Sequence, residues 1–283
     1  MTRAELEKLL RRRGAPRADE IAALALPCLR LDTEPAIGEL RTQIGGLPSL
    51  APDQIWPCST EGAPMTFIAQ LDLSDLDPTP IAGELPRRGL IGWFFDTEAS
   101  LTQGPPEFAM TFAVDPSEVH RVAPPPGARV LAASAVSLRP AWSLPSGGIE
   151  CPFIASLALT SDERKVYREL REEWELDGEP SGHRLLGYAA AFDDPYVGTA
   201  LDFDPELHAR WFAGPPQQRM TLTDELATAA RQLRSIVTFS ANDEMDWADG
   251  APLSYLLKRE AWARGAFHHQ SPSREAAAWC QGT

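Results

Sequence analysis

The predicted fold is decided by the stretch Ile37–Asp96, which contains Ile37-Gly-Glu-Leu-Arg-Thr-Gln-Ile-Gly-Gly-Leu-Pro48, Met65-Thr-Phe-Ile-Ala-Gln-Leu-Asp72 and Gly89-Leu-Ile-Gly-Trp-Phe-Phe-Asp96. The last two runs are short, apolar and rich in β-forming residues. They therefore predict two buried strands joined by a long loop. The pair Gly45-Gly46 predicts either a backbone conformation that other residues resist or a close approach to another segment.

Helices are predicted on both sides of these strands. Thr2 and Glu5 have the spacing of a capping box and open a helix that ends near Gly14. The run Arg11-Arg12-Arg13 is interpreted as a solvated helix end whose cations suit the helix dipole. Further patterns predict a helix over 17–26, a strand over 108–114, helices over 161–176, 204–212 and 223–233, strands over 235–240 and 252–257, and a short helix near Trp279.

The order of these elements predicts an α+β fold, with mostly antiparallel sheets flanked by helices, because no regular β-α-β alternation occurs. We expect a single domain over 1–283 with an N-terminal helical layer at 2–26. The order strand, acidic loop, glycine, strand occurs at Phe67–Phe95 and again at Ile236–Leu257. A further hypothesis is therefore an internal duplication, with halves at about 28–150 and 151–283.

Composition limits the class of protein. Of the 283 residues, 43% are hydrophobic and 23% are charged, which is typical of a soluble globular protein. No apolar run reaches the ~18 residues that a membrane span needs. The N-terminus carries acids where a signal peptide has a basic region. The four cysteines are widely scattered, so free thiols and a cytoplasmic location are predicted.

The net charge of −14 bears on the partner. Nucleic-acid binding needs a basic surface, so a nucleic-acid partner is not predicted. An acidic surface favours solubility, or attraction to a basic protein partner. The sequence contains no phosphate-binding loop, dinucleotide fingerprint, nucleophile elbow or zinc-protease motif. No cofactor is therefore predicted.

Candidate site residues lie on the predicted strands and loops. Gln70 and Asp72 alternate along one strand and so share a face. They would either bind polar groups of a ligand or satisfy the backbone of a buried loop such as Gly45-Gly46. His183 could act as a general base with Asp72 or Asp249 as its partner, or serve as a structural histidine bonded to a loop.

The acidic turn at 243–249 is a candidate cation site. Asp243, Glu244, Asp246 and Asp249 supply oxygen atoms, but their spacing does not match a calcium-binding EF-hand loop. We therefore predict that this segment is a solvated hairpin loop that binds no metal ion. Asp249-Gly250 would form its turn.

Several of these pieces together resemble the YwqG-like family of bacterial domains, which has no settled activity. The matching pieces are Gly45-Gly46-x-Pro48, Trp56-Pro57, Phe67-Ile-Ala-Gln-x-Asp72, Leu85-Pro86-x-x-Gly89-x-Ile91, His183-Arg-Leu-Leu-Gly-Tyr188 and Trp247-Ala-Asp-Gly250. The resemblance implies that His183, Gln70, Asp72 and Asp249 stand at family positions. It also implies a possible place among toxin–immunity loci, as an inhibitor of a basic toxin.

The sequence therefore predicts a non-catalytic binding or protein-interaction module for a small ligand or a basic protein. The alternative is an enzyme that uses His183 with Asp72 or Asp249 in a cleft between the two halves. A third reading is an assembly protein, which would show an apolar patch and a stable oligomer.

Overall fold

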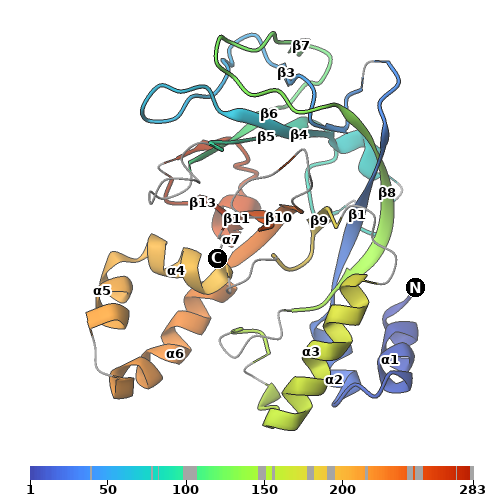
Figure 1. Ribbon diagram of the computed structural model, residues 1–283, viewed down its shortest axis with the longest axis vertical. Helices are drawn as coiled ribbons and strands as arrows, with labels where there is room; N and C mark the ends of the chain where they lie inside the picture. The colour runs from blue at the N-terminus through green and yellow to red at the C-terminus, as the bar shows by residue number, and fades with distance from the viewer. Residues whose placement is uncertain are drawn as a thin grey trace.

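A curved sheet and two groups of helices make up the fold (Figure 1). The computed structural model describes residues 1–38, 40–77, 79–81, 83–97, 107–145, 151–154, 157–176, 182–189, 195–213, 216–240, 245, 251–271 and 273–280. In the view of Figure 1 the sheet lies above, and the helices lie below it in two separate groups, α1–α3 and α4–α6.

The helices are α1 (Arg3–Arg12), α2 (Ala18–Leu24), α3 (Ser161–Leu176), α4 (Pro195–Phe203), α5 (Pro205–Ala213), α6 (Pro216–Arg231) and α7 (Arg259–Ala263), with the 3-10 helix η1 (Leu73–Leu76). The strands are β1 (Leu26–Pro35), β2 (Gln43–Ile44), β3 (Ser49–Leu50), β4 (Thr66–Asp72), β5 (Leu90–Phe95), β6 (Phe108–Ala113), β7 (His120–Arg121), β8 (Ser134–Ser143), β9 (Arg184–Leu186), β10 (Leu233–Phe239), β11 (Leu253–Lys258), β12 (His269–Gln270) and β13 (Ala276–Trp279).

One large antiparallel sheet contains most of the described strands, in the order β12-β6-β5-β4-β2-β8-β1-β9-β10-β11-β13. The sheet curls until its two sides meet. The ring of Trp93 on β5 lies 5.9 Å from that of Phe239 on β10. The hydroxyl of Tyr255 on β11 donates to the Phe94 carbonyl at 2.8 Å. The main hydrophobic core fills the interior of this nearly closed barrel.

The long strands β1 and β8 pair along ten residues and form the middle of the sheet. Their side chains alternate between two faces. Leu29 and Leu31 of β1 are buried in the main core. Cys28 and Arg30 point the other way, toward the helices.

The first helix group covers the outer face near the end of β8. Its core joins Leu6 and Leu10 of α1 to Tyr167 and Leu170 of α3, and to Leu144 after β8. The second group, α4–α6, has a separate core. Within the described residues, no helix has the length and apolar content needed to cross a membrane.

The structure confirms the mixed α+β character and the capping box, in which Glu5 accepts from the Thr2 N–H at 2.7 Å. The β-sheet makes up a larger part of the fold than the sequence predicted. Three elements differ. Helix α4 was not predicted, α6 begins at Pro216 rather than near 223, and the segment before Cys280 is not a helix. That segment forms strand β13, because pairing with β11 overrides the helix preference of its alanines.

Some features agree with the hypothesis of two similar halves. Strands β4–β5 and β10–β11 are antiparallel pairs, and each has one register shift. The strand next to each pair is followed closely by two successive residues with positive φ. These are Gly45-Gly46 after β2, which neighbours β4, and Leu186-Gly187 at the end of β9, which neighbours β10. The duplication itself stays a prediction.

Candidate functional site

Gly45 and Gly46 are held by backbone hydrogen bonds. The Gly45 N–H donates to the Ile68 carbonyl at 2.7 Å, and the Gly46 N–H donates to the Leu131 carbonyl at 2.9 Å. Their φ angles are +68° and +74°. A Cβ atom on Gly45 would lie 2.0 Å from the Ala132 carbonyl oxygen. Both readings of this pair, an unusual conformation and a close approach, are therefore correct.

Gln70 and Asp72 are both buried, and their side chains bond to neighbouring segments of the chain. The Gln70 Oε1 atom accepts from the Ser49 N–H at 2.8 Å. Asp72 Oδ1 accepts from the Ser74 N–H at 3.0 Å and from its hydroxyl at 2.7 Å, which caps η1. Asp72 Oδ2 lies 3.5 Å from Arg41. These contacts agree with the alternative in which the two side chains satisfy backbone groups of neighbouring segments.

His183 is buried just before β9. Its Nδ1 atom accepts from the Ser240 N–H at 3.0 Å, so this nitrogen carries no proton. Burial lowers the pKa of His183 to about 4, and the ring is therefore neutral at pH 7. Strands β2, β8 and β1 separate β9 from β4, which carries Asp72.

The structure does not describe the remaining predicted site. Asp249 and the carboxylates at 243, 244 and 246 fall outside the described residues. In the part of the chain that the structure describes, no group of three or more His, Cys, Asp or Glu side chains could hold a metal ion.

A row of three arginines crosses the middle of the sheet on its outer face. Arg30 of β1 is directly opposite Arg139 of β8 and, on its other side, directly opposite Arg184 of β9. Residues directly opposite in antiparallel strands project to the same face, with Cα atoms about 4.5–5.5 Å apart. Like charges in such positions destabilise a sheet. We call these three residues the arginine row.

The arginine row is not a general feature of the sheet. Farther along β1 and β8, where β2 is the third strand, the row of Glu34, Ala135 and Gln43 contains no cation. All three arginines of the row also interact with other groups of the protein. Arg139 makes a two-bond contact with Asp32, at 2.9 and 3.2 Å. The Nε atom of Arg184 donates to the Tyr188 carbonyl at 3.0 Å.

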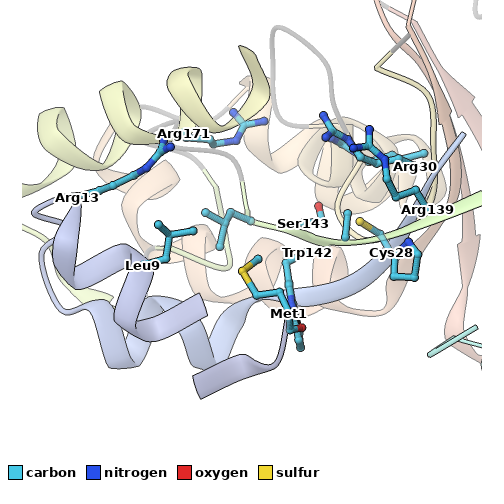
Figure 2. Close-up of a pocket in the computed structure, with 13 residues that line it drawn as sticks. Met1, Leu9, Arg13, Cys28, Arg30, Arg139, Trp142, Ser143 and Arg171 are labelled. Atoms are coloured by element: carbon cyan, nitrogen blue, oxygen red, sulfur yellow. Dashed lines mark hydrogen bonds between the residues drawn. The ribbon is translucent and has the colours of Figure 1, made fainter. Parts of the chain in front are cut away.

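The arginine row lines a pocket of about 250 Å³ between the sheet and the first helix group. Two more arginines complete it. Arg13 caps the C-terminal end of α1, and Arg171 belongs to α3. Figure 2 shows Arg13 and Arg171 reaching the pocket from the helices, and Arg30 and Arg139 reaching it from the sheet. Among the lining residues that the structure describes, five are arginines and none is acidic.

One side of the pocket is largely apolar. Leu9 of α1, Met1 and Trp142 of β8 line it, below the arginines in the view of Figure 2. The indole N–H of Trp142 donates to the Met1 carbonyl at 2.9 Å. The Arg3 guanidinium lies 5.5 Å from the centre of the Trp142 ring. These contacts fix the indole in the pocket.

The electrostatics of the pocket favour an anion. Burial lowers the pKa of Arg30, and the neighbouring charge of Arg139 lowers it further, while Asp32 opposes the shift. Burial disfavours the charged form of the guanidinium, and the charge of Arg139 repels it. Guanidinium groups match the oxygens of phosphates and carboxylates, and bind both through paired hydrogen bonds.

Cys28 lies on the same face, beside the arginine row, but its thiol is not activated. Burial raises the pKa of Cys28 to about 11, although the charges of Arg184 and Arg30 act in the opposite direction. The thiol is therefore protonated at neutral pH, and a thiolate nucleophile is not available there.

The sequence alone does not predict this site. Arg13 is predicted only as part of a solvated helix end, and no pattern singles out Arg30, Arg139, Arg171 or Arg184. Single arginines on predicted strands carry no motif. The only indication in the sequence is that arginines occur inside strands, where charged residues are uncommon. Which of them lie opposite one another follows from the register of the paired strands.

Comparison with known families gives one match. The model of a domain of unknown function, DUF1963, matches residues 42–271. No curated protein matches the chain. Because the family model covers most of the sequence, the chain belongs to the DUF1963 family.

Proposed function

We propose that this member of the DUF1963 family is a binding module whose arginine-lined pocket takes an anionic ligand. The observation that carries the proposal is the arginine row. Arg139, Arg30 and Arg184 stand side by side on three strands of a protein with a net charge of −14. Their mutual repulsion costs stability, and a bound anion would offset that cost.

The test measures stabilisation by small anions. Thermal unfolding is followed with increasing inorganic phosphate or pyrophosphate, and with sodium chloride at matched ionic strength. A ligand that binds only the folded chain stabilises it, by about 2.7 kcal/mol at a concentration of 100 Kd. We expect pyrophosphate to raise the Tm of the wild-type chain well beyond the chloride control.

Two variants with the same change of charge locate the effect. Arg30→Gln removes the central member of the row, and Arg274→Gln removes an exposed arginine outside the pocket. The pyrophosphate effect should vanish in Arg30→Gln and persist in Arg274→Gln. Equal stabilisation of both variants, or no effect beyond that of chloride on the wild type, would contradict the proposal.

A second candidate function is binding of a basic protein, which includes an immunity-type inhibitor of a toxin. The net charge of −14 supports it, because none of the described residues that line the pocket is acidic and the excess of acidic side chains is therefore elsewhere in the protein. Electrostatic steering raises association rates strongly at low salt. An affinity-captured partner should therefore associate at least tenfold more slowly when salt rises from 20 to 200 mM. A rate independent of salt would contradict this version.

We also propose a cytoplasmic location. All four cysteines are free thiols, which is the usual state in a reducing compartment. Fractionation of cells that express the tagged chain would test this assignment.

A further inference from the structure

We propose that strands β12 and β13 form a strap that closes the barrel and opens as one unit while the rest of the chain stays folded. The proposal is independent of the arginine-lined pocket, because neither strand contributes to its described lining. It starts from the position of the two strands. They lie at opposite edges of the large sheet, yet only residues 271–275 separate them in the sequence.

The strap spans the seam between β6 and β11, which are the next strands inward from the two edges. The rings of Phe108 on β6 and Tyr255 on β11 lie 6.0 Å apart across this seam. On one side the Ser271 N–H donates to the Phe108 carbonyl at 2.9 Å. On the other side the Lys258 N–H donates to the Glu275 carbonyl at 2.8 Å. One short segment is therefore bonded to both sides of the seam.

The link between the two strands is itself held by hydrogen bonds. The Ser273 hydroxyl accepts from the Glu275 N–H at 3.2 Å and from the Ala276 N–H at 3.1 Å. The Glu275 carboxylate also pairs with Arg264 at 2.6 Å. Contiguous segments that share such bonds open cooperatively. We therefore expect the loss of one strand to weaken the other.

The strap buries few large side chains. Its residues in the main core are Ala276 and Ala278, which remove little apolar surface from water. By contrast, Phe267, two residues before β12, is buried and packs against the rings of Phe112 and Trp262 at 5.8 and 5.6 Å. Phe267 therefore anchors the start of the strap. Segments with few buried apolar contacts open at a lower free energy than the core.

Each strand of the strap carries one side-chain latch. The Gln270 amide of β12 donates to the Cys58 carbonyl at 2.7 Å, and both residues line a pocket of about 590 Å³. Opening of the strap would therefore remove one side of this pocket. The Trp279 ring of β13 lies against Gly198 of α4, where a Cβ atom would be 2.0 Å from the indole. Glycine is unfavourable inside a helix, and the space taken by the indole explains its presence there.

The test is hydrogen exchange of the full chain, followed by mass spectrometry of its peptides. We expect peptides that cover β12 and β13 to exchange at least about tenfold faster than those that cover β4 and β5. Two truncations release one latch each, Gln270→Ala at β12 and Trp279→Ala at β13. Each should speed exchange at least about threefold in both strands of the strap and leave β4 and β5 unchanged.

Two further variants complete the set. Gln232→Ala is the matched control, because Gln232 is exposed and lies outside the strap, and it should alter none of these rates. Gly198→Ala acts on the Trp279 latch from α4 and should reproduce the effect of Trp279→Ala. Unfolding curves verify that each variant is folded.

The outcomes are distinct. Faster exchange confined to the strand that carries the substitution would contradict opening as one unit. Equal exchange of the strap and of β4 and β5 in the wild-type chain would show that the strap opens only when the whole chain unfolds. Either result would overturn the proposal.

Discussion

Arg30 on β1 lies directly opposite Arg139 on β8, although 108 intervening residues separate them in the sequence. The pairing places two cations on one face of the sheet, and Arg184 adds a third from β9. Such an arrangement should leave a measurable trace in stability as well as in binding.

We predict that Arg30→Gln stabilises the ligand-free chain at low ionic strength. Removal of the central cation relieves repulsion on both sides, which is worth roughly 0.2–1 kcal/mol for each opposed pair. Urea unfolding at 20 mM salt should show the gain, and 500 mM salt should reduce it by screening. Arg274→Gln is the control for net charge. A destabilised Arg30→Gln chain would mean that the row is structurally favourable.

His183 should make stability depend on pH. Its pKa is about 4 in the folded chain and near 6.5 when unfolded, so the unfolded state takes up the proton first. Stability is therefore fully present above about pH 6.5 and falls as the pH drops toward 4. The total loss is roughly 3 kcal/mol. The slope of unfolding free energy against pH should flatten in His183→Gln.

The control for this pH dependence is His120→Gln, which replaces an exposed histidine on β7. That change should leave the slope unaltered. An unchanged slope in His183→Gln, or an imidazole that titrates near pH 6.5 by NMR in the folded chain, would show that His183 is not held neutral.

Gly45 should tolerate no side chain. An added Cβ would lie 2.0 Å from the backbone oxygen of Ala132, and its φ is +68°. We expect Gly45→Ala to cost at least about 3 kcal/mol, from backbone strain and overpacking together. Gly62 has φ of +84° with open space around it, so Gly62→Ala should cost only about 1 kcal/mol. Similar losses in denaturant unfolding would argue against a close approach at Gly45.

The four thiols should differ in reactivity. Burial raises the pKa of Cys28 to about 11 and that of Cys280 to about 12, and Cys151 is fully buried. Cys58 is half-buried and more accessible. Iodoacetamide at pH 8, followed by peptide mass spectrometry, should modify Cys58 first. Prior modification of Cys28 would show that the arginine row does activate its thiol.

Local signals were enough to predict much of the fold. The capping box at Thr2, the apolar runs around Phe67 and Trp93, and the turn-forming Gly45-Gly46 were all visible in the sequence. Each depends on interactions within a few residues or on a short hydrophobic period. Such features can be predicted without knowing which distant segments of the chain pack against them.

Strand β13 shows where that reasoning stops. Its alanines favour a helix in isolation, but pairing with β11 and packing of Trp279 against α4 decide for a strand. The sequence could not predict this choice, because β11 and α4 supply the interactions from elsewhere in the chain.

The sequence by itself determined the α+β character, the helix caps, the buried strands and the acidic balance of the protein, since these follow from local periodicity and composition. Only the tertiary structure decided the candidate site. Arg13, Arg30, Arg139, Arg171 and Arg184 come from α1, β1, β8, α3 and β9, and they share a pocket because strand register and helix packing bring distant segments together. Register is a property of paired strands, which no single segment encodes.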